Sequence, residues 1–356
     1  MKFKNTYTAI GLMSGTSLDG LDIALCVFTK NVKDWDYKII DAKTFSYNTI
    51  WKQKLQNAYL LSAEEVCKLH TNFGAFSALA VNTFIKDKKY RIDVIASHGH
   101  TVFHQPKNRF TCQIGDGATI AALTNIATIC DFRSTDVALG GQGAPLVPIG
   151  DELLFNQFDA CLNIGGIANI SFKHNKERIA FDICPANLVF NFYAAQAGKP
   201  YDKGGKIAAS GKVNEAVLKK LNAFPFYKKH TSKSLGREWI EKEVIALLEN
   251  SNLSLHAKMA TILEHSAFQI AGVLNHFKLK NVLITGGGAY NTYFINRIRH
   301  YTTCELILPD NKTIQFKEAL IFAFLGVLRL REETNCLKSV TGATRNSCSG
   351  ALYLGH

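Results

Sequence analysis

The sequence lacks the most familiar phosphate-binding patterns: neither GxxxxGK[ST] nor GxGxxG occurs in its 356 residues. This argues against a P-loop nucleotidase and against a dinucleotide-binding Rossmann domain. Cysteine pairing is also missing. The nine cysteines are scattered, odd in number and without a CxxC pair, which indicates buried thiols of a cytoplasmic protein rather than a disulfide framework.

Long hydrophobic runs are absent as well. The longest, Ala319–Leu328, is too short to span a bilayer, and Arg329 and Arg331 follow it. After Met1–Lys4 the chain enters a Ser/Thr/Asp-rich turn with no apolar segment typical of a secretory signal. We therefore expect a cytoplasmic protein without a membrane partner.

What is present describes an ordinary globular chain, with 47% hydrophobic and 20% charged residues and a length that favours two domains. The formal net charge is +12, but the basic residues occur in small clusters such as Lys86–Arg91, Lys219–Lys220 and Lys228–Lys229, without interleaved aromatics. We interpret them as a solvated surface that attracts anionic substrates, in preference to a nucleic-acid interface.

The most informative segment is Thr8–Phe28, where a glycine-rich turn joins two predicted strands, Ala9–Met13 and Leu21–Phe28. Gly15 and Gly20 allow the backbone to approach a ligand closely. The hydroxyl donors of the turn are Ser14, Thr16 and Ser17. Asp19 would repel a phosphate unless a cation intervened, so the turn indicates a magnesium-bound nucleotide more than a bare anion.

Two later segments repeat this plan. Asn163–Phe172 is again strand, glycine turn and strand, and the Thr285–Asn291 segment TGGGAYN follows the apolar strand Val282–Ile284. One glycine turn in each half and a third for the adenosine is the layout of the actin, sugar-kinase and heat-shock-chaperone ATPases. We therefore predict an α/β fold of two actin-like (ribonuclease H-like) domains, with ATP in the interdomain cleft.

The order of elements supports two similar halves. The first domain is predicted over residues 1–150, with a C-terminal segment of about 316–356 packing back on it, and the second over 151–315. The predicted elements are the further strands Tyr37–Phe45, Ile92–Ala96, Ala127–Cys130, Ala160–Ile164, Ala168–Phe172 and Arg178–Ile183, and the helices Ser62–Lys86, Asn187–Ala197, Arg237–Glu249, Lys258–Phe277 and Phe316–Arg331. Ser62 and Glu65 fit a capping box.

Several polar residues follow predicted strands, where α/β sheets bind ligands. Asp182 closes one strand and is equally compatible with a catalytic carboxylate and with a helix N-cap. His98, His100 and His104 have spacing that zinc can use, but no acidic fourth ligand is near, so sugar contacts are favoured, with packing as the alternative.

Asp131, Arg133 and Asp136 form a compact group after another predicted strand. Arg133 could bind a substrate carboxylate in bidentate fashion or pair with either aspartate. The segment Gly140–Pro148 is either a close-approach loop or a hinge. Glu318 can be a first-turn acid that complements a helix dipole.

Longer motifs resemble one family. GLMSGTSLDGLD, SHGHTVFHQP, QIGDGATIA, DFRSTDVALGGQGAPLVP, NIGGIANIS, YDKGG, TGGGAYN and VTGATR occur in the order found in anhydro-N-acetylmuramic acid kinases, from about Ala9 to the C-terminus. The resemblance implies an ATP- and Mg-dependent cytoplasmic homodimer of peptidoglycan recycling. It would open the ring of 1,6-anhydro-N-acetylmuramic acid with water and phosphorylate the 6-oxygen, giving N-acetylmuramic acid 6-phosphate and ADP.

The resemblance also assigns residues. Asp182 would be the catalytic base. Our own hypothesis, from the chemistry of the turn, is that Asp19 binds Mg through water. ATP would contact Gly15, Thr16, Ser17, Leu18, Asp19, Gly20, Gly165, Gly166, Gly286, Gly287 and Gly288. The sugar would contact Ser97, His98, Gly99, His100, Thr101, Asp131, Arg133 and Asp136, with Arg133 on its lactyl carboxylate.

One departure concerns the base. The family pattern Asp-Thr-Gly-Pro-Gly/Ala-Asn is replaced here by Asp182-Ile183-Cys184-Pro185-Ala186-Asn187. The carboxylate is kept, but a hydroxyl and a flexible glycine beside it are lost. A kinase for a different sugar and a catalytically impaired ATP-binding regulator are therefore the alternatives, and a nucleic-acid binder is a remote third.

Overall fold

The computed structural model describes residues 3–15, 17–229 and 233–355, which form two compact units. Unit 1 comprises Met1–Leu154 and Phe316–His356, and unit 2 comprises Phe155–Gln315. The second boundary falls inside helix α13 (Asn311–Leu330), where the backbone leaves helical geometry at Phe316 with φ −114° and ψ 15°.

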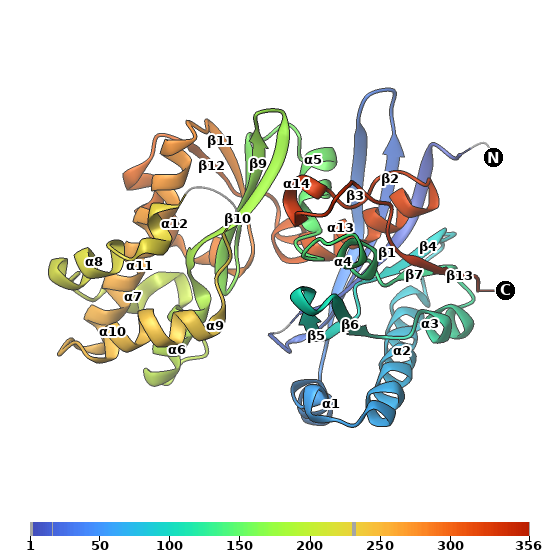
Figure 1. The fold of residues 1–356 in the computed structure, drawn as a ribbon, viewed down its shortest axis with the longest axis horizontal. Helices are drawn as coiled ribbons and strands as arrows, with labels where there is room; N and C mark the ends of the chain where they lie inside the picture. Colours follow the sequence, from blue (N-terminus) through green and yellow to red (C-terminus); the bar gives the residue numbers. More distant parts are fainter. Residues whose placement is uncertain (1–2, 16, 230–232, 356) are drawn as a thin grey trace. The chain divides into compact units, whose positions relative to one another are not determined.

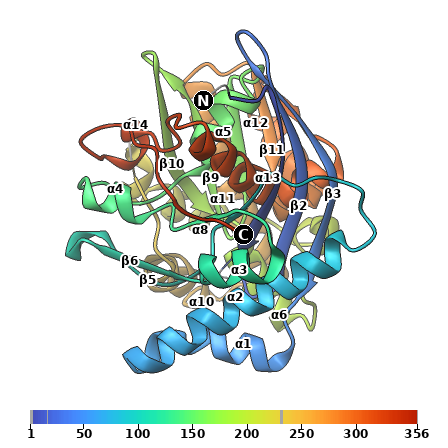
Figure 2. The same ribbon diagram turned by 90° about the vertical axis from the view of Figure 1, so that its right-hand side faces the viewer.

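Unit 1 is built on a six-stranded sheet in the order β13-β7-β4-β1-β2-β3 (Figures 1 and 2). The first three strands form an antiparallel meander, whereas β4 and β7 join the far side of β1 in parallel. The strands are β1 (Thr6–Ser14), β2 (Gly20–Lys30), β3 (Trp35–Ser46), β4 (Val94–Ser97), β7 (Thr128–Cys130) and β13 (Ala351–Tyr353). A separate hairpin consists of β5 (His100–Gln105) and β6 (Phe110–Ile114).

Helices cover both faces of this sheet, which explains why β1 and β2 are almost continuously buried instead of alternating. On one face, Phe73 of α2 (Ala63–Ile85) joins a core with Ile10 and Leu12. On the other, α13 crosses β1 so closely that a Cβ on Gly11 would lie 1.8 Å from the Ala319 carbonyl oxygen. The remaining helices are α1 (Thr49–Gln56), α3 (Gly117–Thr124), α4 (Ser134–Ala138), α5 (Val147–Leu154) and α14 (Lys338–Thr341).

Unit 2 repeats the strand order in a five-stranded sheet, β10-β9-β8-β11-β12. β8, β9 and β10 form the meander, and β11 and β12 follow in parallel on the far side of β8. The strands are β8 (Ala160–Ile164), β9 (Ile167–His174), β10 (Glu177–Pro185), β11 (Asn281–Thr285) and β12 (Glu305–Ile307). Each therefore has a counterpart in unit 1, which is the repeated topology of ribonuclease H-like domains.

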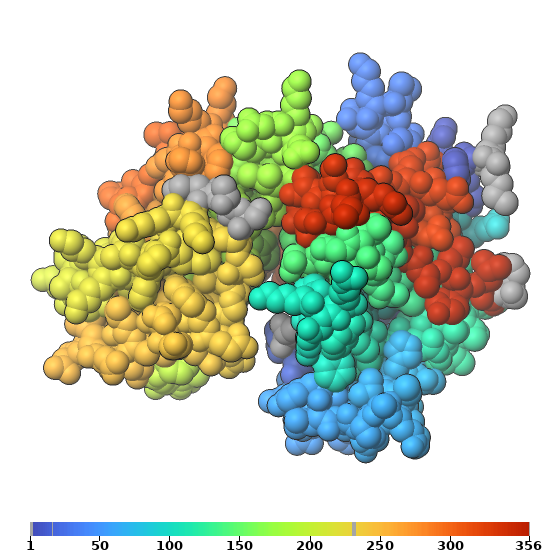
Figure 3. Space-filling view, in the orientation of Figure 1, coloured from blue at the N-terminus to red at the C-terminus, as the bar shows by residue number. Residues whose placement is uncertain are grey.

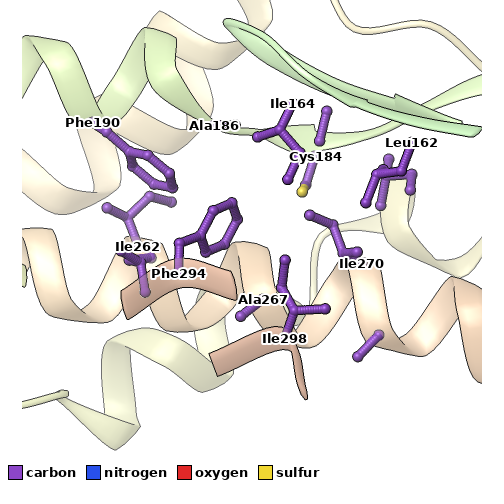
Figure 4. Packing of buried hydrophobic residues seen from close by; sticks show 14 of the residues in the cluster. Leu162, Ile164, Cys184, Ala186, Phe190, Ile262, Ala267, Ile270, Phe294 and Ile298 are labelled. Atoms are coloured by element: carbon purple, nitrogen blue, oxygen red, sulfur yellow. The ribbon is translucent and has the colours of Figure 1, made fainter. Parts of the chain in front are cut away.

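The core of unit 2 lies between this sheet and the long helix α11 (Leu255–His276), whose Ser254 caps the first turn (Figure 4). Phe190 and Phe294 meet edge to face there, with ring centroids 5.2 Å apart. The other helices are α6 (Asn187–Gln196), α7 (Lys206–Ala209), α8 (Glu215–Asn222), α9 (Arg237–Trp239), α10 (Ala246–Glu249) and α12 (Thr292–Tyr301). The short or irregular turns are η1 (Ala58–Leu60), η2 (Pro106–Asn108), η3 (Lys203–Gly205), η4 (Pro225–Lys228), the π-helical η5 (Ile240–Ile245) and η6 (Gly287–Tyr290).

The predicted α/β class with two ribonuclease H-like domains is confirmed. The capping box is present, because Ser62 accepts from the Glu65 N–H while Glu65 accepts from that of Ser62. Two predicted helices begin earlier than expected, at Leu255 and at Asn311. Among the helices so described, none is both long and apolar enough to cross a membrane.

Candidate active site

The first glycine turn connects β1 and β2, as predicted. Leu18 takes the left-handed conformation with φ 58°, and its N–H lies 3.4 Å from the Gly15 carbonyl oxygen. Ser17 and Asp19 are exposed, and the Asp19 carbonyl accepts from the Tyr47 N–H at 3.3 Å. Thr16, which the resemblance assigned to ATP, lies outside the described residues.

Beneath the turn, Ser14 and His100 form a buried hydrogen-bond chain. The Tyr47 hydroxyl donates to Ser14 Oγ at 2.7 Å, and Ser14 Oγ lies 2.9 Å from His100 Nδ1. Burial lowers the pKa of His100 to about 4, so its ring is neutral at physiological pH. The chain therefore joins the predicted ATP turn to the predicted sugar segment without adding charge.

His98 and Arg133 are held by each other. The Gly99 carbonyl can only accept, so His98 Nδ1, 2.9 Å away, carries the ring proton. Nε2 is then an acceptor for Arg133 Nη2 at 2.8 Å and Nε at 3.2 Å, while Arg133 Nη1 donates to the Gly143 carbonyl at 2.6 Å. Burial, and then the Arg133 charge, lower the pKa of His98 to about 3.

This arrangement bears on two alternatives left open by the sequence. His98 is hydrogen-bonded to Arg133, and His100 to Ser14. His104 Nδ1 lies 3.1 Å from Thr111 Oγ1. Across the described parts of the chain, no three His, Cys, Asp or Glu side chains gather as metal ligands. Arg133 likewise forms no ion pair with either predicted aspartate there, because its donors go to His98 and Gly143.

Asp136 is fully buried and already bound. Its Oδ2 accepts from the Gly143 N–H at 2.7 Å, and its Oδ1 accepts from Thr341 Oγ1 at 2.7 Å and from the Cys336 thiol at 3.1 Å. Figure 3 shows the C-terminal segment against the segment that follows β7, where Thr344 N–H also donates to Leu139. Asp136 thus fastens the Gly140–Pro148 loop to the C-terminal segment.

The end of β4 and the end of β7 border a cavity of about 280 Å³ within unit 1. Its lining includes three predicted sugar contacts, His98, Gly99 and Asp131, and Asp131 accepts from Ser134 Oγ at 2.5 Å. Ser97 and Thr101 do not line it: Ser97 Oγ accepts from the Gly99 N–H, and Thr101 Oγ1 from Gln113 Nε2.

The lining also contains polar residues that were not singled out from the sequence, namely His70, Thr111, Gln113, Asp116, Ser134 and Tyr353. Gln113 and Asp116 belong to QIGDGATIA, so that motif carried a signal for part of this group. No sequence motif pointed to His70 and Tyr353, because α2 and β13 bring them to the cavity from distant parts of the chain.

Asp182 lies in β10 of unit 2, next to a bulge between Asp182 and Cys184. Its N–H donates to the Lys233 carbonyl at 3.0 Å, and its Oδ2 accepts from the Leu235 N–H at 2.8 Å. The N-cap of α6 is Ala186, so the interpretation of Asp182 as a helix cap is wrong. Burial raises the pKa of Asp182, while the Leu235 hydrogen bond and the Lys233 charge oppose that rise.

The two residues that depart from the family pattern beside Asp182 are buried. Ile183 and Cys184 belong to the core of unit 2, where Cys184 lies among Ile164, Ala267 and Ile270 (Figure 4). The Cys184 thiol donates to the Ser266 carbonyl at 3.6 Å, and burial raises its pKa to about 12. Such a thiol is unreactive.

The predicted nucleotide glycines fall into two kinds. A Cβ on Gly288 would lie 2.1 Å from Ile164 Cγ2, and one on Gly286, where φ is 83°, would lie 2.6 Å from Asn163 Oδ1, so the fold itself requires glycine there. Gly165, Gly166 and Gly287 have positions for a Cβ with only ordinary contacts, at 3.5 Å or more.

Gly15 in unit 1 is of this second kind, since a Cβ would meet only Ser17 Oγ at 3.7 Å, whereas Gly20 is required by the Phe45 backbone at 2.6 Å. The fold does not explain the absence of a side chain at positions of the second kind.

Repeated ribonuclease H-like topology, glycine turns after corresponding strands and the carboxylate of Asp182, anchored through one oxygen, define an α/β phosphotransferase of the sugar-kinase type. Comparison with known proteins identifies the particular family. The family model described as anhydro-N-acetylmuramic acid kinase matches residues 7–355.

The enzyme of that name from Sulfurimonas denitrificans is 33% identical over 368 residues, covering 97% of this chain and 98% of the relative. The one from Coxiella burnetii is 37% identical over 380 residues, covering 97% of each. The chain therefore belongs to the anhydro-N-acetylmuramic acid kinase family, and the resemblance predicted from the sequence is confirmed. Among solved structures, (R)-2-hydroxyglutaryl-CoA dehydratase component A from Acidaminococcus fermentans is 12% identical, covers 91% of this chain and 99% of its own, and has a TM-score of 0.48, too low to bear on function.

Proposed function

We propose that this chain opens the anhydro ring of 1,6-anhydro-N-acetylmuramic acid with water and transfers the γ-phosphoryl group of ATP to the released 6-oxygen. The products are N-acetylmuramic acid 6-phosphate and ADP. Family membership supports this reaction, and the geometry of Asp182 is the observation that carries the mechanism. One carboxylate oxygen of Asp182 is fixed by Leu235, and the other has no hydrogen-bond partner among the described residues.

The uncommitted Oδ1 is suited to a general base. It takes a proton from water, the water oxygen bonds to the anomeric carbon, and the bond from that carbon to the 6-oxygen breaks. The 6-oxygen bonds to the γ-phosphorus as the bond to ADP breaks, and the proton on Asp182 later returns to solvent. Because phosphorylation captures the leaving oxygen, no second carboxyl group is needed to protonate it.

For the nucleotide, we propose contacts from residues 15–20 in unit 1 and from Gly165, Gly166 and Gly286–Gly288 in unit 2. The glycines that the fold does not require are the ones expected to lie against phosphate or adenosine. Asp19 is exposed and fits an outer contact to Mg²⁺, which prefers water and phosphate oxygens with one or two carboxylates and would neutralise phosphate charge.

For the sugar, we propose the cavity lined by His98, Gly99 and Asp131. Arg133 is not part of that lining but binds His98, and we propose that it contacts the lactyl carboxylate. Three of the five N–H groups of Arg133 are used by His98 and Gly143, which leaves two for a bidentate contact. Ser97, His100, Thr101 and Asp136 would then support this surface through their own hydrogen bonds rather than touch the sugar.

The burial of Ile183 and Cys184 bears on the alternatives. Neither side chain lines the cavity proposed for the sugar, so their departure from the family pattern supports repacking of the core and gives no support to a changed sugar or to a regulator without turnover. We also propose a cytoplasmic homodimer, which sedimentation equilibrium and cell fractionation would test.

The deciding experiment combines ADP release with product mass in normal and oxygen-18 water. The reaction predicts a sugar 6-phosphate carrying one solvent oxygen. Asp182→Asn keeps an oxygen for the Leu235 N–H, so we expect a folded variant whose turnover falls by about 10²–10⁴. ATP binding by a folded wild type without turnover of this sugar would contradict the proposal.

A further inference from the structure

A second cavity lies in unit 2, beside the strand that carries Asp182. It has a volume of about 320 Å³ and is lined by Ile183, Asn222, Tyr227, Lys228, Lys233, Phe268, Gln269, Gly272, Val273 and His276. None of these residues belongs to the proposed nucleotide or sugar contacts. The cavity is nevertheless one residue from the catalytic carboxylate, because Ile183 forms part of its wall.

The lining is basic. Lys228 and Lys233 contribute two ammonium groups, and the lining contains no Asp or Glu. Lys233 Nζ donates to the Phe226 carbonyl at 3.2 Å and lies 4.4 Å from the centre of its ring. Two ammonium groups with no acid in the lining create a positive field that attracts an anion, and the charge of Asp182 beside Lys233 offsets that field in part.

Two further features indicate a ligand. Tyr227 lines the cavity, and its hydroxyl has no hydrogen-bond partner among the described residues. Gly272 lies inside α11, where glycine weakens a helix, yet a Cβ there would meet nothing within 4 Å. Packing does not require this glycine, and its missing side chain keeps the cavity open.

The volume exceeds what a bare phosphate needs, and Phe268, Val273 and Ile183 supply an apolar wall. We propose that this cavity binds a small phosphate monoester, with its phosphate on Lys228 and Lys233 and its body against Phe268 and Val273. The sugar 6-phosphate released by the proposed reaction belongs to this class, so the cavity would let the product regulate its own formation.

Lys233 provides the connection to catalysis, and this step rests on the proposed function. Its carbonyl accepts from the Asp182 N–H, and its charge favours the ionised carboxylate of Asp182. Among the described residues, that carboxylate also accepts from the Leu235 N–H, and its charge acts on the protonated Cys184 thiol. A phosphate on Lys233 would offset its charge, raise the pKa of Asp182 and leave less of the base ionised at low pH.

Binding is tested first on the full chain, without ATP or the anhydro sugar. Glucose 6-phosphate and inorganic phosphate are titrated separately by isothermal calorimetry. We expect glucose 6-phosphate to bind the wild type more tightly than phosphate, Lys228→Gln to weaken it about tenfold and Gly272→Leu to abolish it. Gly272→Ala, which leaves the cavity open, and Lys220→Gln, which lies outside it, are the matched controls.

No binding to the wild type, or equal binding to wild type and Gly272→Leu, would overturn the site, whatever the enzyme's substrate. The coupling is tested by turnover against pH with and without glucose 6-phosphate. We expect the acidic limb to move to higher pH in the wild type and to stay in place in Gly272→Leu. Binding without that movement would refute the coupling, whereas absence of turnover without any probe would count against the proposed function instead.

Discussion

Corresponding strands of the two units end in different chemistry. β1 and β8 are equivalent in strand order, but β1 leads into a five-residue turn with hydroxyls and an aspartate, and β8 into Gly165–Gly166 alone. β4 and β11 are also equivalent. β4 delivers His98, whereas β11 delivers Gly286–Gly288. The same scaffold thus places a polar network at one strand end and bare backbone at the other.

The carboxylates differ in the same way. Asp136 in unit 1 is saturated by three donors, while Asp182 in unit 2 keeps one oxygen uncommitted. A saturated buried carboxylate is a structural element, because each donor that it binds would be unsatisfied without it. A buried carboxylate with only one donor is less stabilised but keeps an oxygen available for reaction. By this difference Asp136 is a structural residue and Asp182 the candidate catalytic one.

Exchanging each carboxylate for its amide should separate the two roles most strongly. Asp182→Asn should lose turnover by about 10²–10⁴ with no loss of stability. Asp136→Asn should lower the free energy of unfolding by about 1–3 kcal/mol, because its amide group would face donors that now meet a carboxylate oxygen. Urea denaturation and ADP release, measured on both variants, check this prediction. A destabilised Asp182→Asn together with a stable Asp136→Asn would contradict the structural role of Asp136 and the catalytic role of Asp182.

The two kinds of glycine give the next largest contrast. Gly288→Ala would force a Cβ against Ile164 and should cost about 1–3 kcal/mol of stability. Gly287→Ala has room in the protein alone and should keep its melting temperature but bind ATP more weakly. Calorimetric melting and nucleotide titration of both variants measure this, and unchanged ATP affinity in Gly287→Ala would remove that residue from the proposed nucleotide contacts.

Much of the fold could be predicted because its strands are apolar and glycine turns separate them. The β5–β6 hairpin could not be predicted in this way, because the β5 sequence HTVFHQ is largely polar and only partly buried. The site was predictable where function depends on a residue type at a strand end, as for Asp182. The site was not predictable where its contacts come from distant parts of the chain. Leu235, which donates to Asp182, lies 53 residues from it in the sequence, and Thr341, which donates to Asp136, lies 205 residues from it.

The smallest predicted effect concerns the charge beside Asp182. Lys233→Gln removes a cation that favours ionised Asp182, so the pKa of Asp182 should rise and the acidic limb of turnover should move to higher pH. The shift should be below about one pH unit, since Lys233 is half-buried and solvent screens its charge. Lys228→Gln is the matched control, because it removes an equal charge from the same cavity, whereas the charge that favours ionised Asp182 is that of Lys233. A pH profile that moves equally in both variants would mean that Asp182 responds to the summed charge of the whole unit. A profile that moves in neither variant would mean that the Leu235 hydrogen bond is the main influence that opposes the rise of the Asp182 pKa caused by burial.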